Sequence, residues 1–399
     1  MIIIKFYKYL KLWRHNLAFL LVVLDGSAEE PLRILDNRTP LEVAKMSNLD
    51  CIAKMSRTFR SNFVPKSLPC GSEVANMAIL GYDPIKYYTG RGALEAASLG
   101  LKIKEGMAAF RLNLVYASDK VMLDHSAGHI KTEVARRLIV ETREHILGNI
   151  NAEIYPGVSY RHILVGDEIW LNAKLTPPHD ILGLEYIDYL PDCEELKALI
   201  NNSIKVFRDY VSGNLDLKVS MVWPWGGGRV VNLPKLKDKF GFRGAVISAV
   251  DLINGLGILC GLEPVKVDNI TGFIDSNFIG KAYGAVEASR YYDFVMVHIE
   301  APDECAHRGD PFLKISALEK IDSEFFSVIL NNLSLFEKIL VVSDHLTSCD
   351  IKTHKHGDVP VLFYDRSYKG KLENTRFTES FSSGSKFIVG HKLLEELIS

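Results

Sequence analysis

Residues 17–26 read LAFLLVVLDG, a short and continuously apolar run that ends in an aspartate and a glycine. Such a run is typical of a strand that is buried on both faces, as in a parallel sheet covered by helices. The Asp25-Gly26 pair predicts a turn, so Asp25 stands at the carboxyl end of the strand. Because ligands of open α/β sheets bind at that end, Asp25 is a candidate site residue.

An alternation of strands and helices resumes in the second half of the chain. Strands are expected at 245–248, near Val265, and at 294–299, 339–342 and 361–364, with helices at 252–260, after Asn277 and at 315–330. A further helix follows the first strand and is expected to run from Pro40 through Ile52, with Thr39 and Glu42 forming a capping box. This rhythm predicts an α/β fold, with a mostly parallel sheet that has helices on both faces.

The pattern changes between about residues 106 and 238. Strands are expected there at 110–116, 160–165 and 219–223, and helices at 131–147 and 194–210. A chain of 399 residues is longer than one hydrophobic core usually grows, which favours two domains. We therefore expect a smaller α+β domain at 106–238, inserted into a discontinuous sheet domain made of residues 1–105 and 239–399.

The composition restricts the kinds of partner. A formal charge of −2 gives no sign of a nucleic-acid-binding surface, so a small-molecule substrate is expected, and a homo-oligomer is compatible with the same composition. Six cysteines without a C-x-x-C pair indicate reduced thiols in the cytoplasm. No apolar run near the start approaches the roughly 20 residues of a membrane span. The basic and aromatic residues 1–15 fit either an extension ahead of the first strand or a membrane-surface or targeting helix.

Carboxylates and imidazoles recur at the predicted ends of strands and starts of helices. They are Asp25 in LVVLDG, Asp303 and His307 in HIEAPDECAHRGD, Asp344 and His345 in LVVSDH, and His354 or His356 in KTHKHGDVP. Taken singly, each has an ordinary explanation as a turn cap, a pair on a helix face or a loop residue. Together, carboxylate oxygens and imidazole nitrogens suit zinc, manganese or similar ions, and their number implies two ions.

Ser72 lies in PCGSEVAN, where residues 71–80 form a helical pattern closed by Gly81. A serine at this position is often only an N-cap. The free amides and the positive end of the helix dipole would also stabilise a phosphate there. Beside the aspartates and histidines, this placement makes Ser72 a candidate nucleophile for phosphoryl transfer.

Several long blocks carry a resemblance to a known family. They include RTPLEVAKMSNLDCIAK, GSEVANMAILGYDPIKYYTGRGALEAASLG, DHSAGHI, TGFIDSNFIGKA, DFVMVHIEAPDECAHRGD and LVVSDHLT. From about Leu21 to Asp365 the chain resembles the archaeal-type cofactor-independent phosphoglycerate mutases of the alkaline phosphatase superfamily. The resemblance implies an alkaline phosphatase-like sheet domain with an inserted cap domain.

The resemblance also implies residue roles. Ser72 would be the nucleophile and also a metal ligand. Asp25, Asp344 and His345 would hold one divalent ion beside it. Asp303, His307 and His354 would hold a second ion. His356 is the alternative to His354, because Asp-Val-Pro stands at 358–360 where the family has Pro-Val-Pro. Residues 27–30 and 35–38 also depart from the family pattern, near the mouth of the site.

The activity implied is the interconversion of 3-phosphoglycerate and 2-phosphoglycerate in glycolysis, through a phosphoserine and without 2,3-bisphosphoglycerate. The two ions would be manganese, magnesium, zinc or cobalt. A related phosphomonoesterase, a homoserine kinase-like phosphotransferase and a non-catalytic binding protein are the alternatives. A substrate carboxylate suits arginine's bidentate fork. The candidates for substrate contacts are Arg111, His129, Arg161, His179 and Asp180, with Arg91 and Arg229 in glycine-rich turns that need no ligand.

Overall fold

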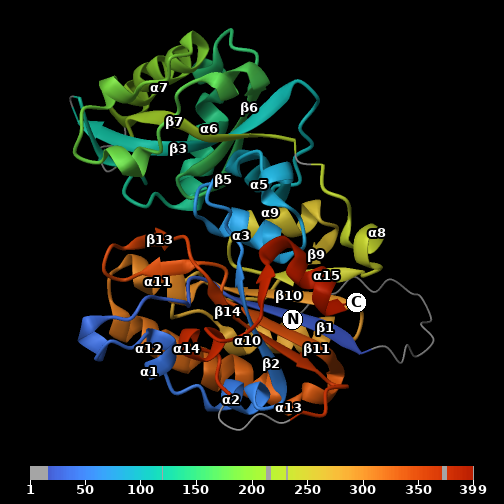
Figure 1. The fold of residues 1–399 in the computed structure, drawn as a ribbon. Helices are drawn as coiled ribbons and strands as arrows, with labels where there is room; N and C mark the ends of the chain where they lie inside the picture. Colours follow the sequence, from blue (N-terminus) through green and yellow to red (C-terminus); the bar gives the residue numbers. More distant parts are fainter. Residues whose placement is uncertain (1–16, 119, 213–216, 231, 371–374, 399) are drawn as a thin grey trace.

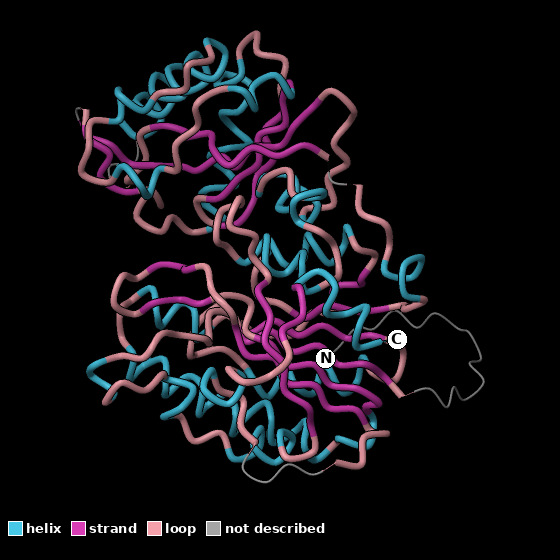
Figure 2. Tube along the Cα trace, in the orientation of Figure 1, coloured by secondary structure: helices cyan, strands magenta, loops and turns pink. Residues whose placement is uncertain are grey.

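The computed structural model describes residues 17–118, 120–212, 217–230, 232–370 and 375–398, and the strands in these residues form two large sheets and one separate two-stranded sheet (Figures 1 and 2). In the larger sheet, β1 (Ala18–Leu24) lies between β10 (Phe294–Ile299) and β11 (Phe336–Val342) and is parallel to both. Beyond β10, β8 (Gly244–Ile247) and β9 (Leu262–Pro264) continue the parallel arrangement. The prediction of a mostly parallel α/β sheet is confirmed.

The other edge of this sheet differs from the prediction. The segment expected as a further parallel strand is β14 (Val359–Asp365), which runs antiparallel to β11. A parallel return needs a crossover to the other end of the sheet. Here the chain instead turns back through a hairpin of β12 (Leu346–Ser348) and β13 (Thr353–Lys355). Outside β14 lie β2, at Ser56–Asn62, and β15, at Phe387–Val389.

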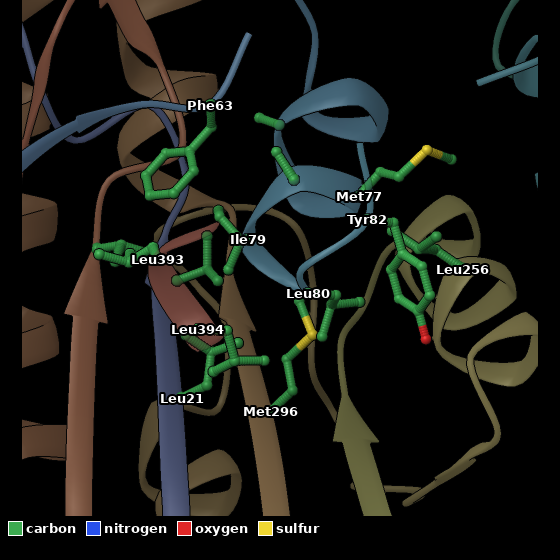
Figure 3. Packing of buried hydrophobic residues seen from close by; sticks show 14 of the residues in the cluster. Leu21, Phe63, Met77, Ile79, Leu80, Tyr82, Leu256, Met296, Leu393 and Leu394 are labelled. Carbon is green, nitrogen blue, oxygen red and sulfur yellow. The ribbon is translucent and has the colours of Figure 1, made fainter. Parts of the chain in front are cut away.

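Helices cover both faces of the larger sheet because the side chains of β1 alternate between two cores. Phe19, Leu21 and Val23 join one core, whereas Leu20 and Val22 join the other. Figure 3 shows the first core packed beneath the helix that follows the candidate nucleophile. The first face carries α3 (Ser72–Ile79), α4 (Pro84–Tyr87), α8 (Leu236–Phe240), α9 (Asp251–Leu259) and α15 (Leu393–Ile398). The second carries α1 (Pro40–Val43), α2 (Ser47–Ala53), α10 (Phe278–Ala288), α11 (Ala301–His307), α12 (Pro311–Ile321) and α13 (Ser327–Asn331).

The helix expected between Pro40 and Ile52 is two helices. The capping box of Thr39 and Glu42 is confirmed, but α1 ends at Val43, because the backbone of the next residue, Ala44, is extended. The second helix, α2, begins at Ser47, and the buried carboxylate of Asp322 accepts hydrogen bonds from the amides of the next two residues at 3.1 and 2.8 Å. Asp322 belongs to a π-helical turn, Asp322–Phe326, that joins α12 to α13 within the helix expected at 315–330. The side chain of Asp322, which is distant in sequence, therefore stabilises the start of the second helix, α2.

The smaller sheet is antiparallel and is formed by residues between 107 and 229. Its strands are β4 (Val121–Asp124), β3 (Met107–Ser118), β6 (Arg161–Asp167), β5 (Glu153–Val158) and β7 (Met221–Arg229). The helices α6 (Thr132–Leu147) and α7 (Glu194–Ser212) pack on it. The three strands and two helices expected in this stretch are present, and β4 and β5 were not predicted.

Helix α5 (Arg91–Ser98) lies between the two sheets (Figure 1). It contacts β3 and β7 of the smaller sheet and also α9, one of the helices that cover the larger sheet. Two glycines allow this close packing, since a Cβ atom on Gly92 would lie 2.2 Å from the carbonyl oxygen of Ala109 and one on Gly255 would lie 1.9 Å from that of Leu94. No described helix is long and apolar enough to cross a membrane. The predicted N-terminal extension at 1–15 lies outside the described residues.

Candidate metal centre

The candidate residues lie at the carboxyl ends of the three central strands. Asp25 follows β1, Asp344 and His345 follow β11, and α11, which follows β10, carries Asp303 and His307. His354 lies on β13 of the hairpin after β11, and Ser72 is the first residue of α3. Because the strands are parallel, segments about 280 and 320 residues away in sequence lie at the same carboxyl end of the sheet as Asp25.

One group surrounds the hydroxyl of Ser72. Its Oγ lies 3.3 Å from Oδ2 of Asp25 and 3.3 Å from Nε2 of His345. The same His345 nitrogen lies 3.4 Å from Oδ2 of Asp344. Gly26 completes the turn at a φ of 56°, and its amide donates to Oδ1 of Asp344 at 3.0 Å. A Cβ atom at Gly26 would lie 2.4 Å from Oδ1 of Asp303, so this position requires glycine.

A second group surrounds Asp303. Oδ2 of Asp303 lies 3.2 Å from Nε2 of His307, and Oδ1 lies 3.4 Å from Nε2 of His354. The two Nε2 atoms are 2.9 Å apart. Nδ1 of His307 lies 2.9 Å from the backbone oxygen of Lys352, and Nδ1 of His354 lies 3.0 Å from that of Cys70. Donation from Nδ1 to these carbonyls leaves the Nε2 lone pairs directed at the centre, as in metal-binding histidines. His356 instead faces the backbone oxygen of Val64.

Burial and crowding of like charges dominate the electrostatics. Burial raises the pKa of Asp25 well above its ordinary value, and the negative charges of Asp344 and Asp303 raise it further. Burial would also raise the pKa of Asp303, but hydrogen bonds from His307 and His354 hold it well below its ordinary value. The hydrogen bond with Asp303 raises the pKa of His307 to about 9. Without a cation, the carboxylates must therefore share protons with the imidazoles.

These groups fit divalent ions. Ligands at about 2.0–2.2 Å from one ion lie roughly 3.0–3.5 Å from each other, which is the range of the separations above. Two sets of three residues each have donor atoms that all lie within 4.8 Å of one another. One set is Asp25, His298 and Asp344, and the other is Asp303, His345 and His354. His345 is close to Asp344 as well as to this second set, so its imidazole lies between the two groups. The donors are oxygen and nitrogen, which suits manganese, zinc or cobalt.

Three buried residues of this centre were not predicted: His298, Thr347 and Asn76. Thr347 donates its hydroxyl to Oδ1 of Asp303 at 2.7 Å and lies 3.0 Å from Nδ1 of His345. The amide of Asn76 donates to Oδ2 of Asp344 at 3.2 Å. Asn76 follows Ser72 by one helical turn, a spacing that the sequence displays. His298 is the penultimate residue of the apolar strand before Asp303, and it too could have been singled out.

Cys70 is the other nucleophilic side chain near Ser72. Burial raises the pKa of its thiol to about 12, with further contributions from the carboxylates of Asp344 and Glu73. The thiolate is the nucleophilic form of cysteine. Cys70 therefore stays protonated near neutral pH, and Ser72 is the better candidate.

Three arginines meet in a cavity beside α5. Arg91, Arg111 and Arg161 line it together with Asp251 at the start of α9. Burial lowers the pKa of Arg111, and the positive charges of Arg91 and Arg161 lower it further, against the opposing effect of Glu95. Arg111 is the buried member of the three and pairs with Glu95 at 3.1 Å, whereas Arg161 is exposed. Three guanidinium groups against the carboxylates of Glu95 and Asp251 leave an excess of positive charge, which favours an anionic ligand.

The arginine cavity is linked to the nucleophile helix. Nε of Arg91 lies 3.7 Å from Oε1 of Glu73, the residue after Ser72. The guanidinium of Arg111 lies 4.1 Å from the ring centre of Trp225, an arrangement that orients a cation. Arg91, one of the weaker candidates from the sequence, thus joins Arg111 and Arg161.

The remaining predicted substrate contacts lie outside that cavity. The His179 ring packs on Trp225 at 5.2 Å, and its Nε2 lies 3.6 Å from the half-exposed Asp180. The ring of His129 faces Tyr160 at 6.3 Å. Arg229 is mostly exposed and pairs with Glu168. The structure therefore brings two of the five predicted substrate residues into one cavity, and the other three are not among the residues that line it.

Comparison with known proteins gives the family. Residues 53–212 match the family model for 2,3-bisphosphoglycerate-independent phosphoglycerate mutase. A probable enzyme of that name from Geobacter sulfurreducens is 36% identical, over 96% of this chain and 100% of its own. A relative of the same name from Methanothrix thermoacetophila is 40% identical, over 86% of this chain and 90% of its own.

A solved structure shares the fold. The cofactor-independent phosphoglycerate mutase from Thermoplasma acidophilum superposes with a TM-score of 0.62 at 25% identity, covering 96% of this chain and 99% of that chain. The identity to the curated relatives extends over almost the whole chain and includes both sheets. The chain belongs to the family of 2,3-bisphosphoglycerate-independent phosphoglycerate mutases.

Proposed function

We propose that this protein interconverts 3-phosphoglycerate and 2-phosphoglycerate, with Ser72 carrying the phosphoryl group between the two positions. The family and its relatives support the activity. The observation that carries the residue assignment is the hydroxyl of Ser72, which lies 3.3 Å from both Asp25 and His345. Its position at the first residue of α3 adds free amides that can bind a phosphate oxygen.

The proposed reaction has two symmetrical halves. Ser72 Oγ gives up its proton and forms a bond to phosphorus as the bond to the substrate oxygen breaks, and the freed glycerate oxygen takes up a proton in exchange. The other glycerate hydroxyl then attacks the phosphoserine, which releases the serine hydroxyl. Two divalent ions, held by Asp25, Asp344 and His345 and by Asp303, His307 and His354, would lower the pKa of the serine and neutralise charge on the phosphoryl group.

The proposed role of the arginine cavity is to hold the glycerate between the two halves. Arg111 and Arg161 come from the smaller sheet, and Arg91 comes from α5. A bidentate grip on the carboxylate would keep glycerate in place while its hydroxyls exchange positions. We propose that residues 106–238 form this substrate-binding domain, and that 1–105 and 239–399 form the metal-binding domain. Exclusion of water between them separates a mutase from a phosphatase.

A coupled assay tests this proposal. Purified protein supplied with Mn²⁺ and 3-phosphoglycerate should generate 2-phosphoglycerate, which enolase converts to a product that absorbs in the ultraviolet. Ser72→Ala should abolish turnover while the protein still binds metal, because six other side chains supply ligands. Cys70→Ala is the matched control, since its thiol is protonated, and it should keep most of the activity.

Free phosphate is measured in the same samples. Release of phosphate without 2-phosphoglycerate would contradict the mutase assignment and favour a phosphomonoesterase. Full activity of Ser72→Ala would show that the nucleophile is misassigned, whatever the substrate. A loss of activity in Cys70→Ala alone would point to the thiol.

A further inference from the structure

His298 lies against the metal centre but is absent from the ligand set proposed above. It occupies the end of β10 in register with Val23, two residues before Asp25. Its side chain is fully buried, and Nε2 lies 3.3 Å from Oδ2 of Asp25. Within the described residues this nitrogen makes no hydrogen bond. A buried polar atom without a partner is costly, so its orientation toward Asp25 requires an explanation.

The other ring nitrogen is held by a buried ion pair. Nδ1 of His298 lies 3.1 Å from Oε1 of Glu300, and Oε2 of the same carboxylate pairs with Nζ of Lys281 at 2.8 Å. Lys281 also donates to the backbone oxygen of His298 at 2.7 Å, and its side chain is fully buried. Ser248 donates its hydroxyl to Glu300 at 2.8 Å. These contacts fix both the ring and the charge of the carboxylate beside it.

The tautomer follows from these contacts. Glu300 is ionised because Lys281 lies against it, so the carboxylate accepts and Nδ1 of His298 donates. In the neutral imidazole, Nε2 then presents its lone pair toward a carboxylate oxygen of Asp25. Two acceptors at this distance repel each other in a buried site unless a proton or a metal ion lies between them, and metal binding displaces protons from its ligands. A carboxylate that orients a histidine toward a metal is a recurrent arrangement in metalloproteins.

We propose that Nε2 of His298 is a further ligand of the ion held by Asp25 and Asp344, and that Glu300 and Lys281 position its ring. The proposal rests on the two-metal centre proposed above and adds one ligand to it. His298, Asp25 and Asp344 form one of the two sets of donor atoms within 4.8 Å of each other. The ion beside Ser72 would then have imidazole nitrogens from both His298 and His345.

Metal titration of the whole protein, stripped of metal beforehand, tests the affinity. Calorimetry with Mn²⁺ should resolve two sites in the wild type. His298→Gln should weaken one site by at least 10–100-fold and leave the other within about twofold, because only one ion loses a ligand. Glu300→Gln should weaken the same site to a smaller extent, since the ligand remains but its orientation is lost. Thermal unfolding of each metal-free variant shows whether it is folded.

His162 provides a matched control. It is also buried, and its Nε2 also lacks a hydrogen-bond partner within the described residues, but it lies on β6 of the smaller sheet. Its Nδ1 accepts a hydrogen bond from the amide of Gly157 at 3.0 Å. His162→Gln should leave both Mn²⁺ affinities unchanged. A decrease equal to that of His298→Gln would mean that loss of any buried imidazole disturbs the centre, and would overturn the proposal.

Pulsed electron paramagnetic resonance of bound Mn²⁺ gives the decisive readout, because it detects directly coordinated nitrogen. The proposal requires four coordinated imidazoles across two ions in the wild type and three in His298→Gln. Three in both proteins would overturn it, even if the affinity falls, because His298 would then act without coordination. Should His298→Gln not fold, the wild-type count decides. If the wild type binds a single ion, the proposal of a two-metal centre is wrong. The number of nitrogens bound to that one ion, with and without His298, would still show whether His298 is a ligand.

Discussion

One hydroxyl links the two halves of the candidate centre at the residue scale. The Oγ atom of Thr347 donates to Asp303 and lies within hydrogen-bond distance of Nδ1 of His345, which can donate to it. Its backbone oxygen accepts from Nζ of the fully buried Lys314 at 2.9 Å, and Lys314 pairs with Glu29 at 3.4 Å. Thr347 is itself fully buried. Such partners orient ligands without touching the metal.

Replacement of Thr347 by valine keeps the shape of the side chain and removes the hydroxyl. Thr347→Val should weaken metal binding by about 10–100-fold, because Asp303 and His345 lose the partner that orients them. The measurement is calorimetric titration of the metal-free protein with Mn²⁺. Thr142→Val is the control, since the buried Thr142 hydroxyl donates to the Leu138 carbonyl within α6 of the smaller domain. Equal Mn²⁺ affinities in the two variants would refute the assigned role.

The short helix α14 (Glu379–Ser382) shows how one element can connect distant parts of the chain. The carboxyl group of Glu379 accepts hydrogen bonds from the Glu29 amide at 2.9 Å and from the Thr39 hydroxyl at 2.6 Å. It thereby ties the C-terminal region to the loop after β1 and to the N-terminus of α1. Burial raises the pKa of this carboxyl group to about 7, although both hydrogen bonds act to lower it.

The raised pKa predicts a pH dependence of stability. The folded protein holds the Glu379 proton up to about pH 7, whereas the unfolded chain loses it near the ordinary value of 4.5. The contribution of this group is therefore complete below pH 4.5 and is lost as the pH rises through 7, at up to about 1.4 kcal/mol per pH unit. Glu379→Gln should remove this slope. Urea unfolding of the metal-free wild type and variant at pH 5 to 8 measures the free energy of unfolding at each pH. If this free energy changed with pH in the same way in both proteins, the slope would not come from Glu379.

The contacts of α5 matter at the scale of the whole molecule. This helix packs on both the smaller sheet and α9, and it carries Arg91 and Glu95 into the cavity that also holds Arg111 and Arg161. The position of the arginine cavity relative to the nucleophile helix therefore depends on how closely α5 approaches its neighbours. Gly255 sets the distance on one side, because Leu94 occupies the space of a side chain.

Gly255→Ala should push α5 away from α9. We expect the KM for 3-phosphoglycerate to rise about tenfold and the unfolding free energy to fall by about 1–3 kcal/mol from overpacking, with Mn²⁺ affinity unchanged. The coupled assay, urea unfolding and calorimetry measure these quantities. Gly384→Ala, where a Cβ atom would meet open space, should change none of them. An unchanged KM in Gly255→Ala would show that α5 does not set the substrate site.

Much of the fold could be predicted from local sequence patterns. The run LAFLLVVLDG identified the central strand, Thr39 and Glu42 identified a helix start, and the strands and helices of residues 107–229 were largely predicted. These features depend on neighbours in the chain, through periodicity, capping and turn residues. The same logic placed Asp25, Asp303 and Asp344 at strand ends or helix starts, and the order of strands and helices implies that these positions lie at the carboxyl end of one sheet.

Only the tertiary structure decided features that depend on distant partners. The hairpin after β11 reversed β14, and Asp322 restarted α2, although the local sequence favoured continuation. The sequence shows His298 as a polar residue in an apolar strand, but only the pairing of β10 with β1 places its ring beside Asp25. Composition and periodicity describe each segment alone, whereas the partner of a buried polar atom comes from packing between segments. That packing determines which side chains of this protein surround the proposed ions and the nucleophile.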